Sequence, residues 1–205
     1  MELLLIRHGE PIRIAEGDVE GPADPGLTAR GVEQAERLAD WLRAERVDEI
    51  VASPLLRARE TAAPLARALG LTVEIDPGVS EYDADSGEYI PIEELRALKD
   101  ERWQATIEGR WDDAGGMDPA VFQKVVVPAM DAIVDRSAGR TVAVVCHGGV
   151  INVYLAHILG TERRLWFHPE YTSLSRVRAS RQGARSVGSV NEIAHLVGRR
   201  DGDAP

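Results

Sequence analysis

The chain has 205 residues, and its 24 Lys and Arg residues against 34 Asp and Glu residues give a formal net charge of −10. This balance excludes a general nucleic-acid-binding or anionic-membrane surface, which needs a basic patch, although a local basic pocket can still bind a small anion. The length fits one domain over residues 1–205. The single Cys146 excludes an internal disulfide framework, and no apolar run suits a signal peptide or a bilayer span, so we expect a cytoplasmic protein.

Aliphatic residues 3–6 predict a strand that ends at Arg7 and His8. Four large aliphatic residues without alternation are typical of a strand that is buried on both faces. Ligands bind at the carboxyl end of such strands, and a guanidinium beside an imidazole keeps the ring neutral while it holds an anion such as phosphate. On this stretch alone, a purely structural His8 explains the pattern equally well.

Between residues 11 and 78, predicted helices and strands alternate. A Gly- and Pro-rich loop over 11–26 precedes a helix with Thr28 as its N-cap, and a second helix ends at Gly70, which suits a C-cap. The expected elements are a helix over 27–42, a strand over 48–52, a helix over 55–69 and a strand over 71–75. This order predicts an α/β three-layer sandwich, with a mostly parallel central sheet and helices on both faces.

The alternation breaks at residues 79–117, which are rich in acidic residues and glycine. We predict that this segment is a cap-like insertion over the carboxyl ends of the strands. One of its apolar stripes, Trp103, Ile107 and Trp111, is expected to pack against the domain rather than contact substrate. Regular elements then return, namely a helix from Pro119, a strand over 141–146, a buried helix over 150–159, and closing strands over 173–179 and 190–197. The polar residues 198–205 are predicted to form a loose tail.

Two of the predicted strands end in a histidine followed by a glycine, at His8-Gly9 and His147-Gly148. Carboxyl ends of parallel strands meet at one edge of the sheet, so both imidazoles are expected there. Arg57 begins the helix after the second strand, and Gly148 opens a helix whose N–H groups favour an anion. Together they predict a site for a phosphoryl group. Carboxylates do not stand at metal-ligand spacing with these histidines, so we expect no metal and no cofactor.

Five runs of residues extend this pattern over nearly the whole chain. They are Arg7-His8-Gly9-Glu10, Asp24-Pro25-Gly26-Leu27-Thr28 with Gly31, Ser53-Pro54-Leu55-Leu56-Arg57-Ala58-Arg59-Glu60-Thr61-Ala62, Val145-Cys146-His147-Gly148-Gly149, and Val190-Asn191-Glu192 with His195-Leu196. In this order they resemble the histidine phosphatase superfamily, which also contains the cofactor-dependent phosphoglycerate mutases. One such run is weak evidence, whereas all of them in the family's order are specific.

The resemblance implies a role for each matching residue. His8 is similar to the nucleophile that forms a phosphohistidine, and Arg7, Arg57 and His147 are similar to the phosphate clamp, with Gly148 beside it. Glu81 resembles the family's proton donor in position, and an acid is required to protonate the leaving alkoxide. Asp83, Asp85 and Glu88 lie close enough in sequence to be alternatives for that acid.

Two departures from the family's mutases favour a hydrolase. Where the mutases carry a hydroxyl residue and an asparagine that assist phosphate, this chain has Pro11 and Ile14, and its 79–117 segment has few basic residues for a phosphoglycerate carboxylate. We therefore expect a metal-independent phosphomonoesterase that acts on a small phosphorylated metabolite. A phosphoglycerate mutase-type enzyme and an inactive phospho-ligand-binding module are the alternatives, and the substrate and oligomeric state, including a homo-oligomer, stay open. His157, His168 and His195 are expected to be structural, with His168 a candidate for the rim of the site.

Overall fold

The computed structural model describes residues 1–111, 116–163, 165–180 and 182–197. In this part of the chain a six-stranded sheet has the strand order β3-β2-β4-β1-β5-β6. The strands are β1 (Glu2–Arg7), β2 (Glu49–Ala52), β3 (Val73–Ile75), β4 (Thr141–Cys146), β5 (Leu174–Ala179) and β6 (Arg185–Glu192). Strands β1 to β4 pair in parallel, and β5 pairs antiparallel with β1 on one side and with β6 on the other. The predicted α/β class with a mostly parallel sheet is confirmed.

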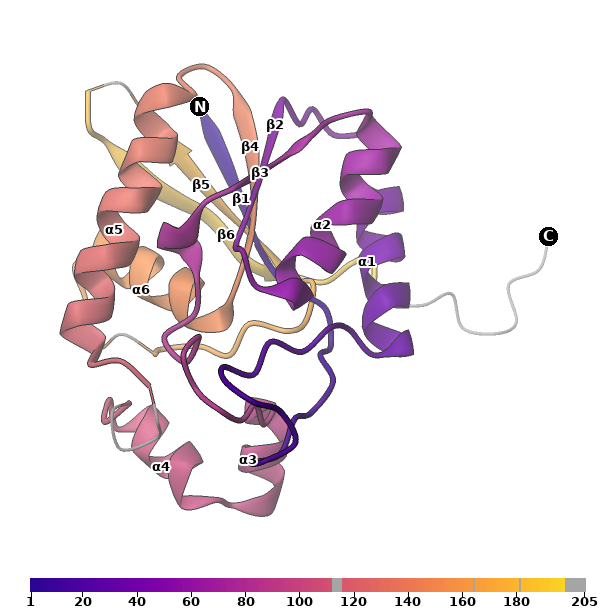
Figure 1. Cartoon of the computed structure of the whole chain (residues 1–205). Coiled ribbons are helices and arrows are strands. Elements are labelled where there is room, and N and C mark those ends of the chain that lie inside the picture. The colour runs from indigo at the N-terminus through magenta and orange to yellow at the C-terminus, as the bar shows by residue number, and fades with distance from the viewer. Residues whose placement is uncertain (112–115, 164, 181, 198–205) are drawn as a thin grey trace.

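Helices cover both faces of this sheet, with α1 and α2 on one side and α5 and α6 on the other (Figure 1). The helices are α1 (Ala29–Leu42), α2 (Leu56–Leu69), α3 (Ile92–Leu98), α4 (Glu101–Ile107), α5 (Pro119–Arg136) and α6 (Gly148–Leu159), with a 3₁₀ turn η1 (Pro77–Val79). Alternate side chains of β1 enter two separate cores. Leu3 and Leu5 pack with α5 and α6, whereas Leu4 and Ile6 pack with α1 and α2. The unbroken aliphatic run is therefore explained by burial on both faces.

Local signals in the sequence place the helix ends well. The Thr28 side chain accepts a hydrogen bond from the Gly31 N–H at the start of α1, and Gly70 ends α2 in the left-handed conformation with φ of 67°. The buried helix α6 starts at Gly148, as expected from the glycines after His147, whereas its apolar run begins at Val150. The two glycines therefore lie in the first turn of the helix.

The last strand was predicted in the wrong place. The sequence indicated a strand over 190–197, but β6 runs from Arg185 to Glu192, and the following residues leave the ladder. The reason is that β6 is an edge strand with alternating half-buried and exposed residues, many of them small and polar. It lacks the apolar stripe that marks a buried strand, and its ladder with β5 carries two register shifts.

The segment over 79–117 contains α3 and α4, which lie beyond the carboxyl ends of the strands (Figure 1). Trp111 is fully buried and packs with Tyr82 and Phe122, as predicted for a residue that anchors the segment to the domain. Trp103 and Ile107 are half-buried and line a cavity, so for both of them the absence of substrate contact stays a prediction. The predicted tail over 198–205 lies outside the described residues.

Candidate active site

The central strand pair brings the two predicted histidines together. β1 and β4 pair in parallel so that Arg7 lies opposite Cys146, and the His8 N–H donates to the Cys146 carbonyl (3.0 Å). The His8 and His147 side chains follow at the same edge of the sheet, with ring centroids 5.1 Å apart. Both residues are buried, with exposed fractions of 2% and 0%. The structure therefore places the two imidazoles next to each other at the carboxyl edge of the sheet, as the sequence predicted.

The hydrogen bond of His8 fixes which ring nitrogen carries the proton. Its Nδ1 lies 2.7 Å from the Gly9 carbonyl oxygen, and because a carbonyl can only accept, Nδ1–H must be the donor. The Nε2 atom then keeps its lone pair. Burial, followed by the charges of Arg57 and Arg7, lowers the pKa of His8 well below its usual value. The ring is neutral near pH 7 and suited to act as a nucleophile.

Three buried side chains beside His8 have donor atoms without partners. Arg57 comes from the first turn of α2 and is 1% exposed, and Arg7 is buried at the end of β1. Within the described residues, Arg7 Nε, Arg57 Nε and His147 Nδ1 lack hydrogen-bond partners. An unsatisfied buried donor costs about 1–3 kcal/mol, so their convergence indicates that an anion pairs with them.

Ser53 is the hydrogen-bond partner of the His147 ring. The Ser53 hydroxyl oxygen accepts from the Leu55 N–H (3.2 Å), and it lies 2.8 Å from His147 Nε2. The hydroxyl can give its proton to Nε2, and in that tautomer Nδ1 is the N–H donor of the ring. Burial and then the charge of Arg57 lower the pKa of His147, so this ring is also neutral. In the tautomer with the proton on Nδ1, His147 can donate to an anion without carrying a charge.

Glu81 lies between the cavity and the start of α6. Its Oε2 accepts from the Gly149 N–H (2.9 Å), and its Oε1 accepts from the Tyr82 N–H (3.1 Å). A Cβ atom on Gly149 would collide with the carboxyl group, so glycine permits this close approach. Burial, and then the charge of Asp83, raise the pKa of Glu81 to about 7. A carboxyl group with this pKa can release and take up a proton at neutral pH.

The other acids near Glu81 are placed less well for that role. Glu88 is bound by Arg102 Nη1 (2.8 Å), and Asp85 is exposed. Asp83 lies 3.6 Å from Arg57 Nη2, and burial raises its pKa as well. The contacts therefore favour Glu81 as the acid and leave Asp83 as a neighbour that adjusts the pKa of Glu81 and holds Arg57.

Sequence reasoning missed a group that holds Arg7. Arg7 Nη1 donates to Glu93 Oε1 (2.6 Å) and to the Pro169 carbonyl (2.6 Å), and its guanidinium lies 4.1 Å from the centre of the Tyr171 ring. Glu93 also accepts from His168 (3.0 Å) and from the Tyr171 hydroxyl. Glu93 and Tyr171 stand in no motif, so spacing alone gave no signal for either, whereas His168 lies at the rim as anticipated.

Tyr89 is a second missed residue, and it lies against the other arginine. Its ring centre is 4.5 Å from the Arg57 guanidinium. Its backbone exchanges two hydrogen bonds with Ile14 (2.9 and 2.8 Å), so the loop after β1 positions it. His157 and His195 do not line the cavity described below: His157 is exposed on α6, and His195 stacks on Trp41 with a hydrogen bond to Thr172.

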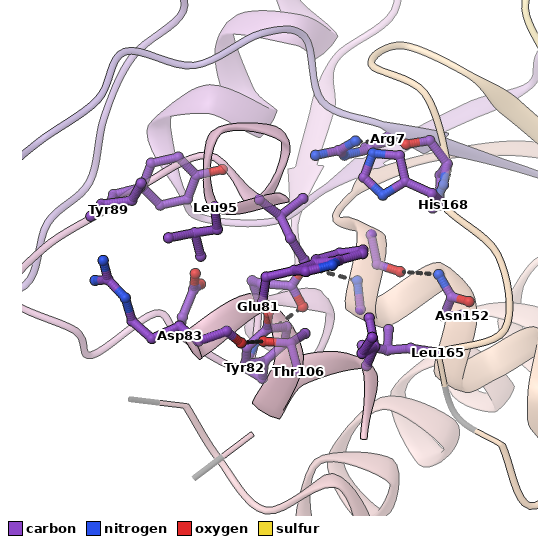
Figure 2. A pocket seen from close by; sticks show the side chains of 18 of the residues that line it. Arg7, Glu81, Tyr82, Asp83, Tyr89, Leu95, Thr106, Asn152, Leu165 and His168 are labelled. Atoms are coloured by element: carbon purple, nitrogen blue, oxygen red, sulfur yellow. Dashed lines mark hydrogen bonds between the residues drawn. The ribbon is translucent and has the colours of Figure 1, made fainter. Parts of the chain in front are cut away.

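A cavity of about 350 Å³ is lined by several of these residues, namely Arg7, His8, Arg57, Glu81, Asp83, Tyr89 and His168. Figure 2 shows Arg7 and His168 on one side of the cavity and Tyr89, Leu95 and Asp83 on the other, with Glu81, Tyr82 and Thr106 near the centre of the view and Leu165 at the lower right. In the part of the chain that the structure describes, no group of three or more His, Cys, Asp or Glu residues is placed to hold a metal ion. In that same part, no helix has both the length and the apolar character to cross a membrane.

Residues 3–192 match the family model of the histidine phosphatase superfamily, branch 1. The chain belongs to this superfamily. Members of the superfamily are phosphatases or mutases, and this supports an enzyme. The family that the sequence motifs indicated is confirmed.

The relatives of this chain include proteins named as mutases and as phosphatases. A probable phosphoglycerate mutase GpmB from Yersinia enterocolitica is 33% identical, and the match covers 96% of this chain and 95% of that protein. A phosphoserine phosphatase mutant from Entamoeba histolytica, solved with phosphoserine, has a TM-score of 0.75 and 26% identity over 96% of this chain and 99% of its own. YhfR from Bacillus stearothermophilus has a TM-score of 0.79 and 25% identity, over 95% of this chain and 98% of its own.

Proposed function

We propose that this histidine phosphatase hydrolyses a phosphomonoester of a small metabolite through phospho-His8, without a metal. The observation that carries the proposal is the neutral His8 ring beside three buried nitrogens without partners, Arg7 Nε, Arg57 Nε and His147 Nδ1. These donors match the oxygens of a phosphoryl group, and their hydrogen bonds stabilise an anion most strongly in a site from which water is excluded. We also propose that residues 79–117 act as a cap on a single domain.

In the first step, His8 Nε2 attacks phosphorus and the bond from phosphorus to the ester oxygen breaks. The Glu81 carboxyl gives its proton to the leaving oxygen, so that an alcohol departs instead of an alkoxide. In the second step, Glu81 as a carboxylate takes a proton from the attacking water, whose oxygen bonds to phosphorus as the bond to Nε2 breaks. Inorganic phosphate is released, and His8 and protonated Glu81 are restored.

The decisive experiment traps the covalent intermediate. The enzyme is mixed with a ³²P-labelled phosphomonoester, quenched in denaturant, and tested for acid-labile, alkali-stable label on the protein. We expect label on the wild-type protein and on a His157→Ala control, because His157 is exposed on α6, and none on His8→Ala. Undiminished label on His8→Ala would contradict the proposal.

The mutase alternative is supported by the name of the GpmB relative, but Pro11 and Ile14 argue against it. The side chains of Pro11 and Ile14 have no hydrogen-bond donor for a phosphoryl group, and the two residues pair through their backbones with Leu27 and Tyr89. Incubation with 3-phosphoglycerate separates the two functions, because a hydrolase releases phosphate and a mutase yields the 2-phospho isomer. Binding of phosphate without turnover of any ester in a broad panel would instead identify an inactive binding module.

A further inference from the structure

The walls above the phosphoryl site are apolar. α3 contributes Ile92 and Leu95, α4 contributes Trp103 and Ile107, and the chain before β5 contributes Leu165 and Phe167. Leu95 and Leu165 lie on opposite sides of the cavity in Figure 2. The volume of about 350 Å³ is in the range of cavities that enclose small ligands, and it exceeds what a phosphoryl group alone fills.

The charged groups of the walls do not favour a second anion on the substrate. Arg102 lines the cavity, but its Nε and Nη2 donate to Asp100 (2.9 and 2.8 Å) and its Nη1 donates to Glu88 (2.8 Å). Asp83 and Glu88 also line the cavity, so a substrate carboxylate would meet like charges there.

Arg163 is the other basic residue of these walls, and it lies at the outer end of the cavity. Its side chain is exposed, and its Nε donates to the Leu165 carbonyl (3.2 Å). A cation in water attracts an anion only weakly, so Arg163 offsets little of the repulsion from Asp83 and Glu88.

We propose that the alcohol part of the substrate is an uncharged apolar group, either an aromatic ring or a branched aliphatic chain. This inference rests on the proposed phosphomonoesterase function and deepens it. The apolar group would replace water against Leu95, Trp103 and Ile107, while the phosphoryl group binds Arg7 and Arg57. Small acids such as phosphoserine and 3-phosphoglycerate are then poor substrates, because their carboxylates lose water without gaining a cation inside the cavity.

The test compares ligands that differ only in apolar bulk. Ethyl phosphate and 2-phenylethyl phosphate both release a primary alcohol, so their chemical reactivities are matched, and ethylphosphonate and 2-phenylethylphosphonate measure binding without turnover. Burying the ring is expected to raise kcat/KM and to lower Kd by roughly 10- to 100-fold. Equal values within each pair, or higher kcat/KM for phosphoserine than for 2-phenylethyl phosphate, would overturn the inference.

A pair of variants on α3 ties the preference to the cavity. Leu95→Asn places an amide in the wall, and we expect the ratio of the two phosphate esters to fall roughly tenfold. Leu98→Asn on the same helix is the control, because Leu98 is 68% exposed and does not line the cavity, and the ratio should not change. An unchanged ratio in Leu95→Asn contradicts the inference.

The phosphonates keep this inference separate from the proposed function. Tighter binding of 2-phenylethylphosphonate than of ethylphosphonate, without hydrolysis of any ester, would support the inference of an apolar ligand and overturn the proposed phosphatase function. Hydrolysis through His8 with equal kcat/KM for ethyl phosphate and 2-phenylethyl phosphate would support the proposed phosphatase function and overturn the inference of an apolar alcohol.

Discussion

Opposing effects set the acidity of Glu81. The N–H groups of Gly149 and Tyr82 stabilise its carboxylate, whereas burial and the nearby Asp83 favour the neutral acid. Burial is the largest of these effects, so the pKa rises. The same carboxyl group can thus donate a proton to an alkoxide and later accept one from water, as two-step hydrolysis requires.

Glu81→Gln tests this role through the pH dependence of turnover. A general acid must be protonated, and the protonated fraction of Glu81 falls as pH rises through about 7, so wild-type kcat/KM for an alkyl phosphate should fall above that pH. Replacement by Gln is expected to lower kcat by roughly 10²- to 10⁴-fold and to remove this alkaline decline.

An aryl phosphate is the control substrate for Glu81→Gln, because its leaving group needs less protonation and its rate should fall less. Asp83→Asn is the matched variant. If the alkaline decline persists in Glu81→Gln and disappears in Asp83→Asn, Asp83 is the acid.

Most of the site was predictable residue by residue because its main groups lie at the ends of regular elements. Arg7 ends β1, His8 and His147 directly follow β1 and β4, and Arg57 lies in the first turn of α2, so a parallel sheet brings them together without further information. Glu93 and Tyr89 belong to the 79–117 segment, whose path depends on tertiary packing. Their contacts with the two arginines could not be read from spacing.

At the scale of elements, the start of α1 fixes the chain that follows β1. A Cβ on Gly9 would come within 2.7 Å of the Gly31 carbonyl oxygen, and a Cβ on Gly31 would collide with the Glu10 backbone. The first turn of α1 and the loop that carries His8 can approach so closely because both residues are glycine. This contact explains why the run of residues that resembles the family has a glycine at position 31.

Gly31→Ala therefore sets two effects against each other. Alanine inside a helix is favoured over glycine by about 1 kcal/mol, but here the new methyl group meets backbone that cannot rotate away. We expect the collision to dominate, with a lower Tm and a kcat/KM reduced through displacement of His8. Glu33→Ala in the same helix should change both little, since it removes one surface ion pair with Arg37. A raised Tm with full activity in Gly31→Ala would contradict the close contact.

Glu93 links α3 to the body of the domain. Burial alone would raise the pKa of Glu93, but the charge of Arg7 and hydrogen bonds from His168, Arg7 and Tyr171 hold it well below its usual range. Its ionised form therefore stabilises the fold above the unfolded-state pKa of about 4.3, and this contribution is lost as pH falls below that value.

Glu93→Gln should lower stability at pH 7 by about 1–3 kcal/mol, because a charged hydrogen-bonding group is lost beside buried Arg7. The difference in Tm from the wild type should narrow as the pH falls below about 4.3. Glu94→Gln is the control, since Glu94 pairs with exposed Arg13 at the surface and should have little effect. A difference that stays constant with pH would show that the Glu93 charge does not carry the effect.

The misplaced last strand shows which elements a sequence predicts poorly. β4 contains only apolar or β-branched residues and was predicted with its observed bounds, because burial on both faces constrains nearly all of them. β6 is constrained only by its pairing with β5, so small polar residues such as Ser186 and Ser189 serve equally well there. Its position was set by the tertiary ladder rather than by hydrophobic pattern.

At the scale of the whole molecule, the candidate active site and the hydrophobic core share strands β1 and β4. β1 and β4 contribute to the cores on both faces of the sheet, and their carboxyl ends carry His8 and His147. An anion that binds there must therefore favour the folded chain over the unfolded chain, in which the donors are dispersed. Ligand binding and global stability are thus coupled.

Cys146 offers a direct measurement of this coupling. It is fully buried next to His147, and burial raises the pKa of its thiol, so a thiol reagent should modify it only when the sheet opens. Inorganic phosphate at about 100 times its Kd should slow labelling by about 100-fold where opening is at equilibrium. Chloride at equal ionic strength should leave the labelling rate unchanged. In Arg57→Ala, phosphate should no longer slow the labelling. Rapid labelling that phosphate does not change would instead mean that Cys146 is reached by a local opening independent of the anion site.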